Sequence, residues 1–169
     1  MRNADEPSVF CRDEKPEVLK NTFYPPMKIR FVMLGKMRRS KSRLLMEDYV
    51  SRIERYENIE VNELREASAS ALRKLKIEPS ATVVLLDAMG KQFTSAQFAR
   101  WIGDLRDRGT RELVFVCGGA EGFPDELRAS AKHKISLSTF TMPHELARVM
   151  LAEQVYRAFA ILAGHPYPK

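Results

Sequence analysis

Short apolar runs alternate with segments of helical periodicity along most of this 169-residue chain. Five of the runs predict β-strands, at residues 29–34, 59–64, 82–86, 113–117 and 135–138. The runs at 82–86 and 113–117 are apolar throughout, which is typical of central parallel strands covered on both faces. The run at 59–64 alternates apolar and polar residues, as a half-exposed strand does.

Apolar residues at turn spacing predict three helices between these strands, at residues 40–56, 67–76 and 94–109. The third of these helices has Thr94 or Ser95 as its N-cap, and Gly109 ends it. Strands that alternate with helices in this way predict an α/β fold with a mostly parallel sheet and helices on both faces.

The last helix, from Pro143 to Gly164, is apolar on nearly every side. A helix of this kind must be buried all round. Packing one face on the sheet and another on a second subunit would bury it in a domain of this size. A central helix in a monomer is the alternative.

The first 26 residues differ from the rest of the chain, because they are rich in charge and Pro and lack hydrophobic periodicity. We interpret residues 1–26 as a flexible N-terminal extension, outside the translated protein if Met27 is the true start. Residues 27–169 then form one domain, long enough to bury a hydrophobic core.

The overall composition, 44% hydrophobic and 30% charged, is ordinary for a soluble globular protein. No apolar run approaches the roughly 20 residues that span a bilayer, so we expect no membrane association. Cys11 and Cys117 lie far apart without metal-ligand spacing. The chain is therefore predicted to be cytoplasmic, without disulfides or a bound metal.

Positive charge is concentrated near the first strand, within a net charge of +6 for the whole chain. Residues 27–57 carry nine Lys or Arg against four Asp or Glu, a local net charge of +5. Five of the nine fall within eight residues: Lys36, Arg38, Arg39, Lys41 and Arg43. Such a cluster attracts phosphate backbones through counterion release, so we expect it to bind RNA; a solvated loop without a partner is the alternative.

Nucleotide-binding fingerprints are absent, since neither GxGxxG nor GxxxxGK[ST] occurs. The three histidines, His133, His144 and His165, do not suggest a hydrolase triad or a metal site. What remains are three loops after predicted strands, at residues 86–91, 118–124 and 137–144, where ligands of parallel sheets bind.

The second and third of these loops have the chemistry of a ligand site. The paired glycines Gly118 and Gly119 would let the backbone take a positive φ and approach a ligand closely. Residues 137–144 mix hydroxyls with apolar side chains ahead of a helix, which suits an adenosine group.

These loops, followed by a Tyr-Arg-Ala helix and a His-Pro-Tyr tail, closely resemble those of the ribosomal RNA large subunit methyltransferase H (RlmH) family. The resemblance covers residues 27–169 and is most specific in VFVCGGAEG (114–122), SLSTFTMPHELARVMLAEQVYRAF (136–159) and HPY (165–167). Members of that family are SPOUT-class enzymes that methylate N3 of a pseudouridine in 23S ribosomal RNA.

The resemblance implies a SPOUT-type α/β fold with a C-terminal trefoil knot, a homodimer, and S-adenosylmethionine as cofactor. The implied cofactor contacts are Leu86, Gly118, Leu137, Ser138, Thr139, Phe140, Thr141 and Met142. Composition and periodicity alone do not predict the knot, because chains are almost never knotted.

Catalysis would require the base nitrogen to be held in line with the methyl group and to lose its proton. The candidates for this chemistry are His165 and Tyr167 in the tail, His144 at the start of the last helix, and Arg148 as a ligand of a phosphate or an imide oxygen. Structural alternatives are that His144 caps its helix, that Arg148 pairs with Glu145, and that Tyr156 packs at an interface.

Two features depart from the family pattern. Pro168 follows Tyr167 where relatives often have a final histidine, and the extension has no counterpart. We expect an S-adenosylmethionine-dependent methyltransferase acting on a pseudouridine of 23S rRNA in the assembled ribosome. The alternatives are a SPOUT enzyme acting on tRNA or another rRNA site, and a non-catalytic RNA-binding factor of the ribosome.

Overall fold

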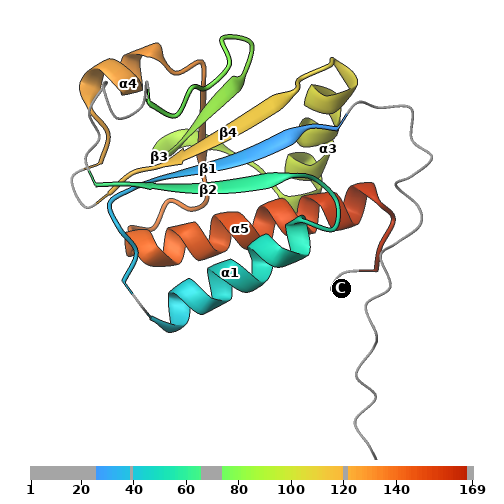
Figure 1. The fold of residues 1–169 in the computed structure, drawn as a ribbon, viewed down its shortest axis with the longest axis horizontal. Coiled ribbons are helices and arrows are strands. Elements are labelled where there is room, and N and C mark those ends of the chain that lie inside the picture. The colour runs from blue at the N-terminus through green and yellow to red at the C-terminus, as the bar shows by residue number, and fades with distance from the viewer. Residues whose placement is uncertain (1–25, 39, 66–73, 120–121, 167–169) are drawn as a thin grey trace, which may run out of the picture.

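A computed structural model describes residues 26–38, 40–65, 74–119 and 122–166 of the chain (Figure 1). Its sheet consists of five strands: β1 (Lys28–Leu34), β2 (Ile59–Leu64), β3 (Thr82–Gln92), β4 (Glu112–Cys117) and β5 (His133–Ser136). All neighbouring strands are parallel, in the order β2-β1-β4-β3-β5. The predicted α/β fold with a parallel sheet is therefore confirmed.

The two central strands are the most apolar, as their sequences require. Every residue of β4 is buried, and in β1 only Lys28 is not. Odd-numbered β1 residues such as Phe31 belong to one hydrophobic cluster, and even-numbered residues such as Val32 belong to another. Because successive side chains point to opposite faces, the sheet has a core on each side.

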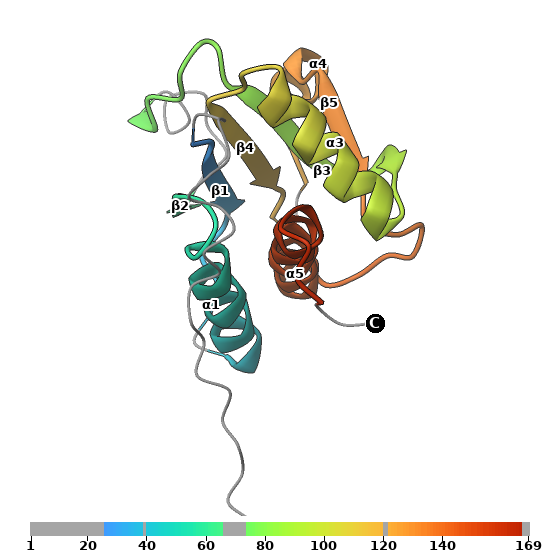
Figure 2. The same cartoon turned by 90° about the vertical axis from the view of Figure 1, so that its right-hand side faces the viewer.

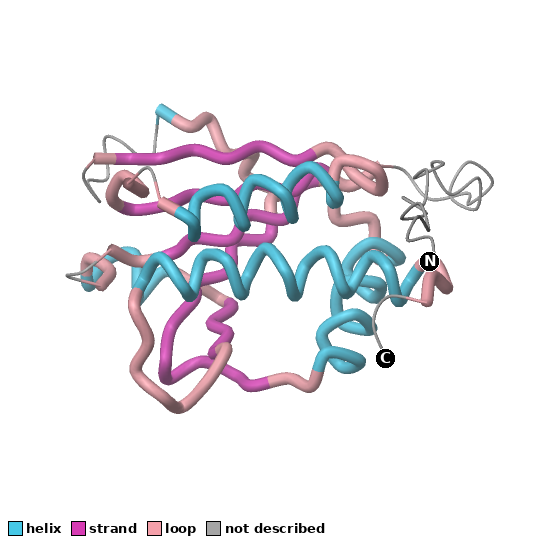
Figure 3. Tube along the Cα trace, turned by 90° about the horizontal axis from the view of Figure 1, so that it is seen from below, coloured by secondary structure: helices cyan, strands magenta, loops and turns pink. Residues whose placement is uncertain are grey.

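Three helices cover one face of the sheet: α1 (Lys41–Ile53), α3 (Ser95–Asp107) and α5 (His144–Leu162). The short helix α4 (Asp125–Ser130) lies on the other face, as Figures 1 and 2 show. Helices α1 and α5 run side by side along the strands (Figure 3). Among the described residues, the layers are thus three helices on one face, the sheet, and α4 on the other face.

Helix α5 packs between α1 and α3 and against the sheet within a single chain. Tyr156, on its α1 side, is buried against Tyr49 and Tyr56. Among its large apolar residues, only Leu146 and Ile161 are exposed. One chain therefore supplies most of the burial that α5 needs, and the α5 pattern by itself does not require a second subunit. Tyr156 is only 6% exposed in the single chain, so packing against α1 accounts for its burial.

Several boundaries differ from the predictions. Strand β3 continues to Gln92, so residues 86–91 are not a loop but an irregular part of a strand whose pairing with β5 shifts between Leu86 and Lys91. Strand β5 ends at Ser136, two residues earlier than predicted. Helix α4 was not predicted, because only six residues form it and they carry no clear apolar repeat.

The helix predicted at residues 67–76 lies largely outside the described residues, as does the extension before Pro26. The extension and the trefoil knot therefore stay predictions. Met27 itself is fully buried, and its N–H donates to the Glu57 carboxylate at 3.0 Å. None of the helices in the described segments is long and apolar enough to cross a membrane.

Candidate cofactor site

A cavity of about 300 Å³ opens at the carboxyl ends of β4 and β5, next to the part of β3 where its pairing with β5 shifts. The carboxyl ends of parallel strands lie at the same edge of a sheet, so three segments far apart in sequence meet there. They are the Leu86–Ala88 part of β3, the glycine loop after β4, and the loop that joins β5 to α5. The start of α5 and the end of α4 complete the walls.

The structure brings together nearly all of the residues expected to bind the cofactor. Seven of the eight line the cavity: Leu86, Gly118, Leu137, Ser138, Phe140, Thr141 and Met142. Thr139 is not among the lining side chains and is exposed. The combination of hydroxyls, backbone and apolar side chains is suited to a nucleoside with one apolar face.

Hydroxyl groups fix the shape of the loop between β5 and α5. The Ser136 hydroxyl, which is buried, donates to the Ser138 carbonyl at 2.9 Å. The Ser138 hydroxyl in turn accepts from the Phe140 N–H at 3.0 Å. These bonds use side chains to satisfy the loop backbone, so the loop holds its conformation without a regular element.

Gly118 and Gly119 had been expected to take a positive φ. Instead, both glycines matter because they allow backbone segments to approach closely. Among the described residues of this loop, the positive φ, +77°, belongs to Gly122. A Cβ on Gly119 would lie 2.8 Å from the Leu34 carbonyl oxygen, too close for a methyl group, and one on Gly118 would lie 3.4 Å from the Gly122 backbone. Glycine here allows the ends of β1 and β4 and the returning loop to pack together.

Arg148, a candidate ligand of RNA, is fully buried beneath this site. Its Nη2 donates to the Leu34 carbonyl at 2.6 Å, while Nε and Nη1 have no hydrogen-bond partner among the described residues. Burial lowers the pKa of the guanidinium, and the nearby Cys117, Glu63 and Glu145 act in the opposite direction. This position argues against contact with a phosphate or an imide oxygen and supports a role in joining α5 to the end of β1.

Cys117, the last residue of β4, lines the floor of the cavity. Burial raises the pKa of its thiol to about 12, an effect that the charge of Arg148 partly offsets. The thiol is therefore neutral at physiological pH and adds a largely apolar surface to the site.

The two candidate histidines lie at opposite ends of α5. His144 is the first residue of α5 and lines the cavity, whereas His165 follows the helix and is exposed. Nineteen helical residues separate the two ends by roughly 28 Å, at about 1.5 Å per residue. Tyr167 lies outside the described residues. Within one chain, His165 and the cofactor cavity therefore lie far apart.

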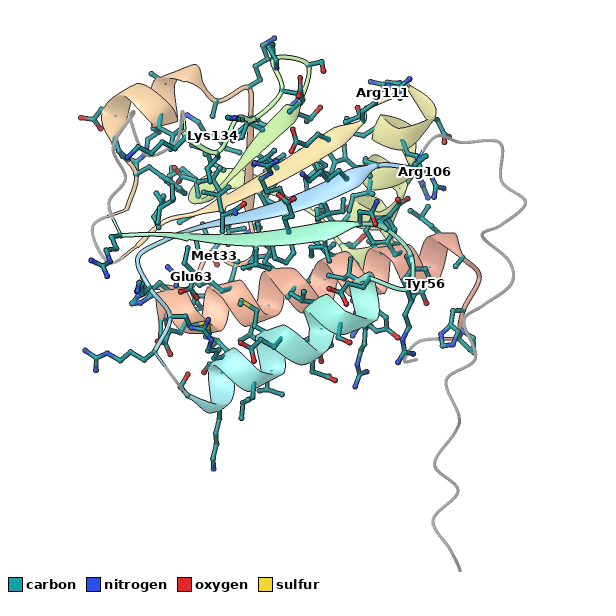
Figure 4. The ribbon with its side chains drawn as sticks, in the orientation of Figure 1. Met33, Tyr56, Glu63, Arg106, Arg111 and Lys134 are labelled. Carbon is teal, nitrogen blue, oxygen red and sulfur yellow. The ribbon has the colours of Figure 1, made fainter. Side chains whose placement is uncertain are left out.

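The basic cluster lies at the same end of the sheet as the cavity. Figure 1 shows the loop from β1 to α1 next to the start of α5, and Figure 4 shows Met33 and Glu63 at this end, far from Tyr56 and Arg106. The Arg38 N–H and the Ser40 hydroxyl both lie 3.4 Å from the carboxylate of Glu145 on α5.

Only part of this cluster faces solvent freely. Lys36, Arg38 and Lys41 are exposed, and Arg39 lies outside the described residues. Arg43 instead pairs with Glu47 at 2.9 Å and Glu63 at 3.2 Å, and also donates to the Met37 carbonyl. Arg43 therefore stabilises the loop. It had been expected to bind RNA, but its guanidinium is engaged in these contacts.

Two charged residues of the cavity wall, Asp87 and Arg128, were not among the expected cofactor contacts. The sequence placed Asp87 in the predicted ligand loop at residues 86–91 without assigning it a role, and it missed Arg128. Arg128 belongs to α4, which carries no apolar repeat that would have predicted it.

The whole folded region matches one family model, described as predicted SPOUT methyltransferase, over residues 27–168. The chain belongs to the SPOUT methyltransferase family. It is 42% identical over 151 residues to a protein of Geotalea daltonii named ribosomal RNA large subunit methyltransferase H, covering 83% of this chain and 99% of the relative. A protein of the same name from Allorhizobium ampelinum is 41% identical over 157 residues, covering 83% and 98%.

A solved structure described as a probable methylase family protein from Haemophilus influenzae has the same fold. The TM-score is 0.50 at 10% identity, covering 83% of this chain and 70% of the other. The family and fold indicated by the sequence motifs are thus confirmed, and with them the expectation of a methyltransferase.

SPOUT methyltransferases use S-adenosylmethionine, and the cavity of this member fits such a ligand. Gly118 leaves the space next to the Gly122 backbone that a side chain would fill. Leu137 and Met142 offer apolar surface, and the 137–142 backbone has hydrogen-bonding groups of the kind that an adenine edge requires.

Proposed function

We propose that this protein is an S-adenosylmethionine-dependent methyltransferase that methylates N3 of a pseudouridine in 23S rRNA. The observation that carries the proposal is the cavity itself, in which seven of the eight expected cofactor residues converge from three segments. The relatives' name, ribosomal RNA large subunit methyltransferase H, supports large-subunit rRNA as the substrate.

S-adenosylmethionine supplies, when bound, a methyl group on a positively charged sulfur. The residues of this chain hold and orient the reactants and exclude water, which provides most of the rate in a direct transfer. The loop at 137–142 would hold the adenosine, and its internal hydroxyl bonds keep it preorganised. Preorganisation reduces the entropy that binding would otherwise cost.

The N3 proton of the base must leave during the reaction, and His144 is the best-placed acceptor in the same subunit. It lines the cavity at the first position of α5 and is exposed to solvent, so it can pass a proton onward. An imidazole nitrogen within hydrogen-bond reach of the base can act as the proton acceptor that this step requires.

A homodimer would bring the His165-Pro166-Tyr167 tail to this cavity. The tail of the same chain starts roughly 28 Å from His144, but a partner with α5 running in the opposite direction would place its tail near it. Leu44 and Leu45 on α1, 67% and 53% exposed, together with Leu146 and Ile161 on α5, offer apolar surface for such an interface.

The ribosome in the cytoplasm is the proposed substrate particle. Lys36, Arg38 and Lys41 project from the loop that Glu145 connects to the start of α5, next to the cavity. Phosphate contacts position a nucleic acid but do not specify a base. A domain of this size would therefore depend on the shape of a larger target for selectivity.

Calorimetry with S-adenosylmethionine and mass spectrometry of rRNA from a deletion strain test the proposal together. The purified protein should bind S-adenosylmethionine without added metal, and Gly118→Val should abolish binding because its side chain would fill the cradle beside Gly122. Ala96→Val, at an exposed position of α3, is the matched control. Normal binding by Gly118→Val would refute the site, and an unchanged 23S rRNA methylation pattern in the deletion strain would refute the substrate.

A further inference from the structure

One wall of the cavity carries an ion pair that the function described above does not use. Arg128 Nε lies 3.2 Å from Asp87 Oδ2, linking α4 to the irregular part of β3. Both residues line the cavity. The Asp87 side chain is only 9% exposed, whereas that of Arg128 is 48% exposed.

The two groups retain hydrogen-bonding capacity beyond their mutual contact. A carboxylate has about four acceptor sites, and within the part of the chain that the structure describes Asp87 accepts from the Arg128 Nε and from the Met89 N–H, which lies 2.9 Å from Oδ1. A guanidinium has five N–H donors arranged to bind a carboxylate, and the pair with Asp87 uses the Nε donor of Arg128.

The pair lies on a different side of the cavity from His144. Leu85 contacts the hydrophobic cluster on the α4 face of the sheet, and alternation places Asp87 on that same face. His144 and Ala147 belong to α5, on the opposite face. The cavity therefore runs around the end of the sheet, from a charged wall on the α4 side to the helix that carries the candidate base.

We propose that Asp87 and Arg128 bind the amino-acid end of S-adenosylmethionine, Asp87 through its α-ammonium group and Arg128 through its α-carboxylate. Among the lining residues that the structure describes, Asp87 is the only carboxylate and Arg128 the only guanidinium. An ammonium and a carboxylate on one carbon match such a pair in sign. Charge-assisted bonds of this kind are the stronger class of hydrogen bond, more so in a partly buried site.

This assignment rests on the proposed function, because it places one part of the cofactor that the function requires. It also gives the cofactor a direction in the cavity. The adenosine would lie against the 137–142 loop and the amino-acid end against α4, which leaves the sulfur between them, facing the strand ends.

The test compares three ligands by calorimetry: S-adenosylmethionine, S-adenosylhomocysteine and 5′-methylthioadenosine. The first two share the amino-acid end, and the third keeps the adenosine and sulfur but lacks the ammonium and carboxylate. Asp87→Asn and Arg128→Gln should each weaken the first two roughly tenfold to hundredfold, as expected when bonds to charged groups are removed. Both variants should bind 5′-methylthioadenosine as the wild type does.

Asp48→Asn on α1 and Arg100→Gln on α3, both exposed and away from the cavity, are the matched controls and should leave all three affinities unchanged. Equal weakening of all three ligands would overturn the assignment, since the pair would then only brace the cavity wall or bind the ribose. Unchanged affinities in both variants would overturn it as well. A wild-type protein that binds none of the three would instead refute the proposed function.

Discussion

Arg148 is the largest fully buried side chain of the described core, and its burial depends on a contact that its sequence position does not reveal. Its position at turn spacing on α5 does not distinguish it from a surface arginine in the sequence. Its burial follows from contacts with Leu34, 114 positions earlier in the chain. Local pattern carries no information about such a contact, so the sequence allowed a role in catalysis that the structure argues against.

Replacing Arg148 should therefore affect stability more than chemistry. We expect Arg148→Ala to lower the free energy of unfolding by about 3 kcal/mol, because it leaves a cavity and an unpaired Leu34 carbonyl. Arg148→Met fills most of the volume and should cost less. Urea unfolding measures both, and single-turnover methylation by Arg148→Met is the control. A large loss of rate in a stable Arg148→Met protein would restore a direct role in the reaction.

Cys117 should make the free energy of unfolding depend on pH in the alkaline range. Its pKa is about 12 in the folded protein, because of burial, against an ordinary thiol value near 9 in the unfolded chain. Between these values the unfolded chain has released a proton that the folded protein keeps. The free energy of unfolding should thus fall as pH rises, by about 1 kcal/mol per pH unit from this group. Below pH 8 the contribution is fully present.

Urea unfolding of wild type and Cys117→Ala at pH 8 and pH 10 measures this effect. The lysines and tyrosines are common to both proteins, so the difference between their pH slopes isolates the thiol. Parallel stability curves would show that Cys117 ionises in the folded protein as easily as in the unfolded chain.

At the scale of elements, the sequence predicted most of the fold because local signals agreed with tertiary packing. The apolar runs of β1 and β4 became the buried centre of the sheet, and the stop at Gly109 follows α3 as expected. The predicted boundaries were wrong where packing against neighbouring elements, and not the local sequence, determines the secondary structure. Strand β3 extends to Gln92 because β5 pairs with its shifted second half, and α4 forms at a site without apolar periodicity.

The start of α3 offers a test at this scale. The sequence left Thr94 and Ser95 as alternative caps, and the structure selects Thr94, whose hydroxyl accepts from the Gln97 N–H while the Gln97 side chain accepts from the Thr94 N–H. Thr94→Ala should lower the free energy of unfolding by about 1 kcal/mol. Thr110→Ala, in the turn beyond α3, is the matched control. Equal small losses for both variants in urea unfolding would contradict the capping role.

At the scale of the whole molecule, the parallel sheet determines which functional groups lie together. Its strand ends place the cofactor cavity and the basic cluster at one edge. The order of elements predicted ligand loops after the strands, but not that the basic cluster lies beside them. The direction of α5 carries the tail to the opposite edge. That separation could not be predicted from motifs, because His144 and His165 both lie within the segment that resembles the family.

The basic cluster should control ribosome binding without changing the affinity for the cofactor. Replacing Lys36, Arg38 and Lys41 with Ala should weaken binding to ribosomes and reduce its salt dependence, by about one in log–log slope for each RNA phosphate that is no longer neutralised. Filter binding at several salt concentrations measures the slope. Affinity for S-adenosylmethionine should not change, and Arg100→Ala and Arg108→Ala on the α3 side are controls for net charge. An unchanged slope in the triple variant would assign RNA binding to another surface.

The distance between cavity and tail leads to a prediction about the complete enzyme. If each site combines the cavity of one subunit with the tail of the other, two different defects should complement each other. Homodimers of Gly118→Val lack a working cavity, and homodimers truncated after Gly164 lack the tail, so both should be inactive.

A heterodimer of the two keeps one intact cavity facing one intact tail. It should regain roughly half of the wild-type activity, since one of its two sites is complete. Affinity-tagged heterodimers purified after co-expression, assayed on ribosomes, test this directly. If the cavity and tail of the same chain formed the site, each heterodimer would contain two incomplete sites and would stay inactive.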